Sequence, residues 1–240
     1  MSSKFSVLAA MLYRRNGIKP ELDKQYKQGN GVLHAEYAHS DTLKLTSYAY
    51  LLEDTYNTCG ANVEGKVNAA ATDVSYLAEY AIQQDATIKD GTATNIDSSY
   101  YNIEVGAKFG PVFSKVGYEV FGDKGDGAKG FSTPLATLHK FNGWSDVLLG
   151  HAAAGNDDGL KDLNFTIGYA TKSLGEAMLV YHKFDSVKND VDFGSEIDLL
   201  YKKKLAPKVT LLVKAALYNN ESNSALLDTN KYWVMTSIGL

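Results

Sequence analysis

Residues 163–170 read LNFTIGYA, and this stretch shows the pattern that decides the fold. Leu163, Phe165, Ile167 and Tyr169 alternate with smaller or polar residues. Successive side chains of a β-strand point to opposite faces of the sheet, so the stretch predicts a strand with one apolar and one largely polar face. The same two-residue period recurs in 74–82 (VSYLAEYAI), 101–109 (YNIEVGAKF), 197–201 (IDLLY) and 209–217 (VTLLVKAAL).

Six further segments are expected to form strands. With the five stretches above they give about eleven, so we predict an all-β, transmembrane, antiparallel up-and-down barrel of about 10–12 strands. Most segments reach roughly 9 residues, the length that a tilted strand needs to cross a bilayer. Strands of soluble sandwiches are commonly shorter, at about 5–6 residues. The six segments are Phe5–Tyr13, Val32–His39, Leu43–Glu53, Val112–Phe121, Ala177–Phe184 and Tyr232–Leu240.

The expected connections are of two kinds. Gly110-Pro111, Ser173-Leu174-Gly175 and Ala206-Pro207 predict tight turns. Short turns at one rim and long loops at the other are typical of outer-membrane barrels. Because no linker divides the chain, residues 1–240 are expected to form a single β-barrel domain or the C-terminal part of a larger barrel. The long polar connections are predicted at 54–73, 84–99, 122–160 and 219–230.

The composition excludes several classes of protein. No stretch approaches the roughly 18 apolar residues of a membrane-spanning helix. The net charge of −4 argues against a nucleic-acid partner, which usually meets a basic surface. The single cysteine, Cys59, has no partner for an intrachain disulfide. Residues 5–13 resemble part of a signal peptide, but Arg14 and Arg15 follow directly, so we interpret them as a strand.

Charged residues occupy the polar face of the predicted strands. So many charges could not be packed into a dry core, but they could line water in a pore. A soluble carrier barrel with the opposite face inward remains an alternative, as does pairing of opposite charges that stiffens the wall. Both signs are present, so no ion preference is predicted. The pore-lining candidates are Glu36, Lys44, Glu79, Glu104, Lys108, Lys115, Glu119, Glu196, Asp198 and Lys214.

The segment Gly122–Leu160 is too long for a featureless loop in a compact domain. It contains a helix signal, because Thr133 can cap a helix, Pro134 suits its first position, and Asn142-Gly143 can end it. We therefore expect a long, partly helical loop here.

Within this loop, the run GDGAKGFSTPLATLHKFNGWSDVLLG (125–150) resembles a signature of the alginate-export-like family of bacterial outer-membrane porins. The resemblance is specific over 125–185, where Tyr181-His182-x-Phe184 also agrees, and looser over 70–240. Family members usually carry more strands and end in Phe, where this chain has Leu240.

The resemblance implies a lipid-embedded channel in the bacterial outer membrane. It would allow passive diffusion of small polar or anionic solutes, saccharides among them. The loop would then fold into or over the lumen as a constriction. The candidate residues for that constriction are Phe131, Thr133, Pro134, His139, Lys140, Phe141, Asn142 and Trp144.

Other chemical motifs are weak. Residues 125–130 match GxGxxG but open no crossover helix, so they are interpreted as a glycine-rich loop. Ser132 or Ser145 with His139 could be arranged as a catalytic pair, but closeness in sequence is poor evidence for that. The acidic residues at 157–158 do not have the spacing of a calcium loop.

We therefore predict no catalytic residue, no metal site and no cofactor. The alternatives to a channel are a filled structural or binding barrel and a barrel enzyme, and homo-oligomerisation is left open.

Overall fold

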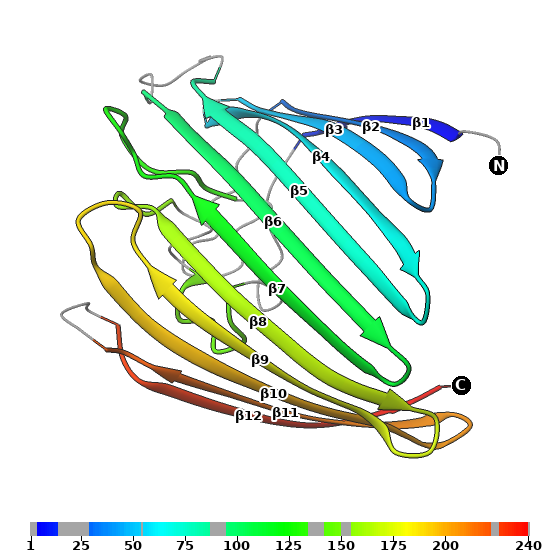
Figure 1. Cartoon of the computed structure of the whole chain (residues 1–240). Helices are drawn as coiled ribbons and strands as arrows, with labels where there is room; N and C mark the ends of the chain where they lie inside the picture. The colour runs from blue at the N-terminus through cyan, green and yellow to red at the C-terminus, as the bar shows by residue number, and fades with distance from the viewer. Residues whose placement is uncertain are drawn as a thin grey trace.

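The computed structural model describes residues 4–13, 29–53, 55–86, 95–133, 142–149, 155–221 and 226–239. In them, twelve strands form one antiparallel sheet in which each strand pairs with its neighbours in sequence (Figure 1). The predicted all-β, up-and-down architecture is therefore confirmed. The strands are β1 (Lys4–Leu12), β2 (Asn30–Ser40), β3 (Leu43–Leu52), β4 (Tyr56–Ala69), β5 (Thr72–Gln84), β6 (Asp97–Phe109), β7 (Val112–Phe121), β8 (Leu160–Thr171), β9 (Gly175–Asp185), β10 (Asp192–Ala206), β11 (Val209–Asn219) and β12 (Thr229–Ile238).

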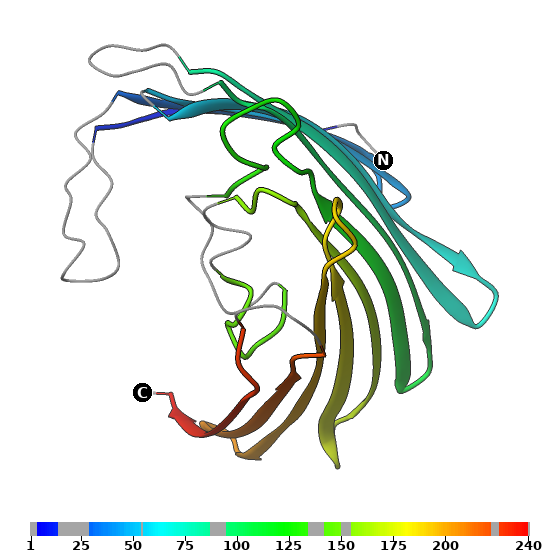
Figure 2. The same cartoon turned by 90° about the vertical axis from the view of Figure 1, so that its left-hand side faces the viewer.

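The sheet curves into an open arc with a concave and a convex face (Figure 2). Its edges are β1 and β12, which in the described part of the chain hydrogen-bond only to β2 and β11 respectively. The strands are 9 to 15 residues long. A tilted strand of about 9–11 residues already crosses a bilayer, so every strand is long enough to do so.

The two faces differ in chemistry, as the alternation predicts. Exposed apolar side chains such as Leu45, Ile103 and Leu163 lie on the convex face. The concave face is polar, and one row of its residues crosses seven neighbouring strands in direct register. This row consists of Glu36, Thr46, Asn62, Glu79, Asn102, Glu119 and Asp162.

The two rims of the arc also differ. At one rim the strands are joined by short turns, at 41–42, 70–71, 110–111, 172–174 and 207–208. At the other rim most connections are longer, including 85–96, 122–159 and 220–228. The predicted difference between rims is therefore present, although one connection at the second rim, 53–55, is short.

The prediction of a long polar loop at 54–73 is wrong, because this segment contains β4. The strand pairs continuously with β3 from Tyr56 to Glu64 and with β5 from Asn57 to Ala69. Asn57, Gly60 and Asn62 have low strand propensity, which hid the strand in the sequence. Pairing with a neighbour on each side supplies the backbone hydrogen bonds that override this local preference.

The central part of the helix predicted in the long loop, residues 134–141, lies outside the described residues, so the structure does not test it. The flanking stretches 131–133 and 142–148 have no regular secondary structure. Among the described residues, no helix is long and apolar enough to cross a bilayer.

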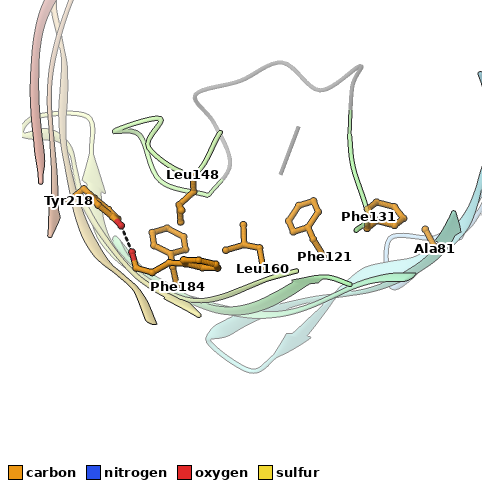
Figure 3. Packing of buried hydrophobic residues seen from close by; sticks show 8 residues of the cluster. Ala81, Phe121, Phe131, Leu148, Leu160, Phe184 and Tyr218 are labelled. Carbon is orange, nitrogen blue, oxygen red and sulfur yellow. Dashed lines mark hydrogen bonds between the residues drawn. The ribbon is translucent and has the colours of Figure 1, made fainter. Parts of the chain in front are cut away.

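Apolar side chains gather where the long loop meets the concave face (Figure 3). Phe131 and Leu148 come from the loop, and Phe121, Leu160 and Phe184 come from the ends of β7, β8 and β9. All five are at most 5% exposed. Because burying one such side chain contributes about 1.5–3 kcal/mol, this cluster holds the described parts of the loop firmly against the sheet.

Candidate functional site

Residues 122–159, which connect β7 to β8, are called the insert below. Its described parts lie on the concave side of the arc (Figure 2). One part is attached to β4 and β5 through Ser132. The Ser132 amide donates to Gln83 Oε1 (2.9 Å), and Gln83 Nε2 and the Tyr56 hydroxyl donate to the Ser132 carbonyl oxygen (2.6 and 3.4 Å). This attachment fixes residues 131–133 to one half of the wall.

Residues 142–146 (NGWSD), called the anchor below, attach the insert to the other half of the wall. The first contact is made by Asn142, whose backbone has a left-handed φ of 55°. Its side-chain Nδ2 donates to Glu119 Oε2 (2.8 Å) on β7 and to Asp162 Oδ2 (3.3 Å) on β8. An Asn tolerates this backbone conformation better than most residues, so it can both turn the chain and make these bonds.

Two carboxylates on β10 bind the backbone of the anchor. The Trp144 amide donates to Asp198 Oδ2 (3.2 Å). The Ser145 amide donates to Glu196 Oε1 (2.6 Å), and the Ser145 hydroxyl donates to Glu196 Oε2 (2.5 Å). Asp198 is fully buried and Glu196 is 1% exposed. A buried carboxylate needs such hydrogen bonds to offset its lost hydration, so these contacts join the insert to β10.

Two lysines complete the anchor contacts. The Lys214 ammonium group on β11 lies 4.1 Å from the centre of the Trp144 ring and 5.0 Å from that of Trp233 on β12. The Lys231 Nζ lies 2.9 Å from Asp146 Oδ2. A cation over an aromatic face contributes about 0.5–2 kcal/mol, so Lys214 links an indole of the insert to an indole of the wall.

His182 on β9 connects the carboxylates beneath the anchor. Its Nδ1 is 2.9 Å from Asp162 Oδ1, and its Nε2 is 3.8 Å from Asp198 Oδ2. The ring also stacks on Phe184, with 5.3 Å between the ring centres. Sequence reasoning treated this histidine as a generic surface or lumen residue. The two-residue period of β8, β9 and β10 predicts that Asp162, His182 and Asp198 lie on one face of the sheet. It does not predict that they contact one another.

The predicted pore-lining residues all lie on the concave face, but their surroundings differ. Away from the insert, Lys44 pairs with Glu36 (3.4 Å) and with Glu64, and Lys115 pairs with Glu104 (2.8 Å). These side chains are about one-third exposed, so each pair contributes roughly 0–1 kcal/mol. The remaining members fall into three groups: Lys108 is exposed, Glu79 is half-buried, and Glu119, Glu196, Asp198 and Lys214 contact the anchor.

Two tyrosines orient wall carboxylates and were missed by sequence reasoning. The Tyr48 hydroxyl donates to Glu79 Oε1 (2.5 Å), and the Tyr100 hydroxyl donates to Glu119 Oε1 (2.6 Å). The Tyr100 ring also stacks on Phe131 of the insert, 5.3 Å between ring centres. Tyr48 also packs against the apolar cluster that contains Phe131, so Glu79 lies on the wall beside the packed edge of the insert.

Four of the predicted constriction residues are described by the structure. Phe131, Asn142 and Trp144 are at most 8% exposed and face the wall, and Thr133 is half-buried. They hold the insert in place rather than presenting side chains to open solvent. The other four, Pro134, His139, Lys140 and Phe141, lie outside the described residues, as does any pairing of His139 with a serine.

Charges in the outer parts of the insert are paired locally. The Asp157 carboxylate lies 2.9 Å from Lys124 Nζ, and its hydrogen bond raises the pKa of that lysine. Asp123 Oδ2 lies 3.6 Å from Lys188 Nζ in the connection between β9 and β10. These loop carboxylates join neighbouring connections at the long-loop rim.

Comparison with known proteins identifies the fold. No protein-family model matches the sequence, and no curated protein sequence matches it. Among solved structures, OccAB2 of Acinetobacter baumannii has a TM-score of 0.68 at 17% identity, covering 96% of this chain and 64% of that one. The structure of Pseudomonas aeruginosa OpdK with vanillate has a TM-score of 0.68 at 16% identity, covering 97% and 65% of the two chains.

OpdQ of Pseudomonas aeruginosa is similar, with a TM-score of 0.66 at 16% identity over 97% of this chain and 67% of that one. All three are outer-membrane porins of the Occ and Opd type. The chain spans about two-thirds of the length of these structures. Its twelve strands therefore have the fold of a large part of an outer-membrane porin.

Proposed function

We propose that this chain forms the wall of a porin-like channel in a bacterial outer membrane, through which small polar or anionic solutes, saccharides among them, diffuse passively. The observation that carries the proposal is the division of the sheet into two faces. The convex face presents apolar side chains, and the concave face presents charges and holds the insert. Such a division suits lipid on one side and water on the other.

In this channel, the insert acts as the constriction. Its two attachments to the wall, at Ser132 and at the anchor, place it inside the arc. Charges near a constriction influence which solutes pass. The wall charges left accessible, Glu79 near the insert and the Lys44 and Lys115 ion pairs farther from it, would then be the ones that passing solutes meet.

The ring of the channel includes strands beyond these twelve. In a bilayer, unpaired backbone groups at a sheet edge are costly, so both β1 and β12 need partners. This chain covers 64% and 65% of the length of two similar porins, which supports its being a part of a larger barrel. The resemblance of 125–185 to alginate-export-like porins is a narrower hypothesis, which no comparison supports and on which the channel does not depend.

The proposal is tested by single-channel recording in planar lipid bilayers. We expect stepwise currents from folded protein, and larger steps after removal of residues 125–157 from the insert. A filled structural or binding barrel is the competing function, since the cluster around Phe131 and Leu148 occupies part of the arc. Folded protein that conducts neither with nor without the insert would establish that alternative. No step of the proposed function requires catalysis.

A further inference from the structure

We infer that the contact between the anchor and Glu196 sets the width of the constriction, which makes Glu196 and Gly143 positioning residues of the channel. This inference rests on the proposed function, because it specifies how that function's constriction is held. The sequence predicted that Glu196 lines open water, whereas in this inference Glu196 is buried and holds the insert.

Glu196 is placed to bind the anchor and not a solute. It is 1% exposed, and both of its carboxylate oxygens accept hydrogen bonds from Ser145. Hydrogen bonds to charged groups are the stronger ones, and a buried carboxylate that loses its donors is penalised further. Release of the anchor would therefore take from Glu196 both of its Ser145 donors until water replaced them.

Gly143 shows how closely the anchor fits this carboxylate. Its φ is 85°, a left-handed conformation that side chains rarely adopt. A Cβ added there would overlap Glu196 Oε2. The anchor can therefore approach β10 only because residue 143 has no side chain.

The anchor also connects many strands within five residues of sequence. Besides β10, it contacts Glu119 on β7, Asp162 on β8, Lys214 on β11 and Lys231 on β12. Together with Ser132 on the β5 side, it fixes the insert at two places on the concave face. Loss of the Glu196 contact removes the central bonds of this set, so the anchor can move away from β10 and change the open area, while Leu148 stays in the apolar cluster.

The experiment compares Glu196→Gln and Gly143→Ala with the wild-type chain in planar bilayers. Gly143→Ala retains every charge, so behaviour shared by both variants cannot arise from a lost carboxylate. Asp192→Asn is the matched control, because it converts a carboxylate on the same strand that pairs with Lys183 outside the anchor. Folding is checked by circular dichroism and by heat-dependent migration in gels.

We expect both anchor variants to occupy a second conductance level on the order of tenfold more often than the wild type does. This is the effect expected from losing a hydrogen bond to a charged group. Trypsin should also cleave them faster within residues 122–159, whereas Asp192→Asn should behave like the wild type. If Gly143→Ala does not fold, Ser145→Ala, which removes a single hydroxyl donor, replaces it in the same comparison.

The two proposals fail in different ways. A folded wild-type chain that carries no current contradicts the channel itself. A conducting wild type whose folded anchor variants keep its current levels and its cleavage rate shows that Glu196 does not position the constriction.

Discussion

At the scale of single residues, a glycine determines where one wall carboxylate points. The Tyr48 ring lies directly over Gly60 on the neighbouring strand, and its hydroxyl reaches Glu79. A Cβ at position 60 would overlap the ring atoms of Tyr48, so any larger residue there must displace the tyrosine. Glycine in a strand, which is usually unfavourable, is needed here for packing.

We expect Gly60→Ala to lower the free energy of unfolding by about 1–3 kcal/mol, because overpacking forces Tyr48 off its position. The measurement is urea unfolding in lipid vesicles, followed by circular dichroism. Gly31→Ala on β2 is the control, since its Cβ would meet Leu51 at an ordinary 3.6 Å. Equal stabilities of the two variants would show that Tyr48 adapts without loss.

The sequence predicted which residues share the charged face, but not which of them the insert covers. The period of two assigned Glu104 and Glu196 to the same face, and the register agrees. Glu196 is nevertheless buried, because Ser145 binds it across 51 positions of the chain. A contact of such separation leaves no local pattern in the sequence.

At the scale of elements, β4 is the strand that local propensity failed to reveal. Its convex-facing positions include small residues such as Cys59 and Ala61, so the strand lacks the bulky alternation that marks its neighbours. Strands with strong alternation, such as β7, were predicted at their observed bounds. A strand could therefore be predicted where large apolar residues alternate with polar ones, as in β7, and was missed where they do not, as in β4.

Cys59 makes the orientation of β4 testable. It is exposed on the convex face, so in vesicles a membrane-impermeant maleimide should leave it unmodified while a lipid-soluble maleimide reacts. Asn62→Cys in a Cys59→Ser background is the counterpart on the concave face, and the impermeant reagent should label it. The opposite labelling pattern would mean that the convex face of β4 meets water.

At the scale of the whole molecule, the open arc of the described residues leaves the sheet with two free edges, at β1 and at β12. β1 and β12 expose apolar residues such as Val7 and Val234 beside unpaired backbone groups. Edges of this kind pair readily with further strands. The number of strands in the proposed ring could not be derived from the alternation, because each hairpin shows the same period.

Cysteine pairs can show whether the twelve strands close on themselves. In a Cys59→Ser background, Val213→Cys/Val234→Cys should form a disulfide on oxidation, because these residues are direct partners on β11 and β12. Val7→Cys/Val234→Cys should not, since other strands separate the two edges in the proposed ring. Efficient crosslinking of the second pair in membranes would instead indicate a closed twelve-stranded barrel.

The position of Lys214 between two indoles has an optical consequence. The chain contains two tryptophans, and both rings lie against this ammonium group, one from the insert and one from the wall. Under excitation selective for tryptophan, the emission of the protein therefore originates entirely at the junction between the moving and the fixed part of the proposed channel. Fluorescence of the unlabelled protein can follow the seating of the loop in real time, without any introduced dye.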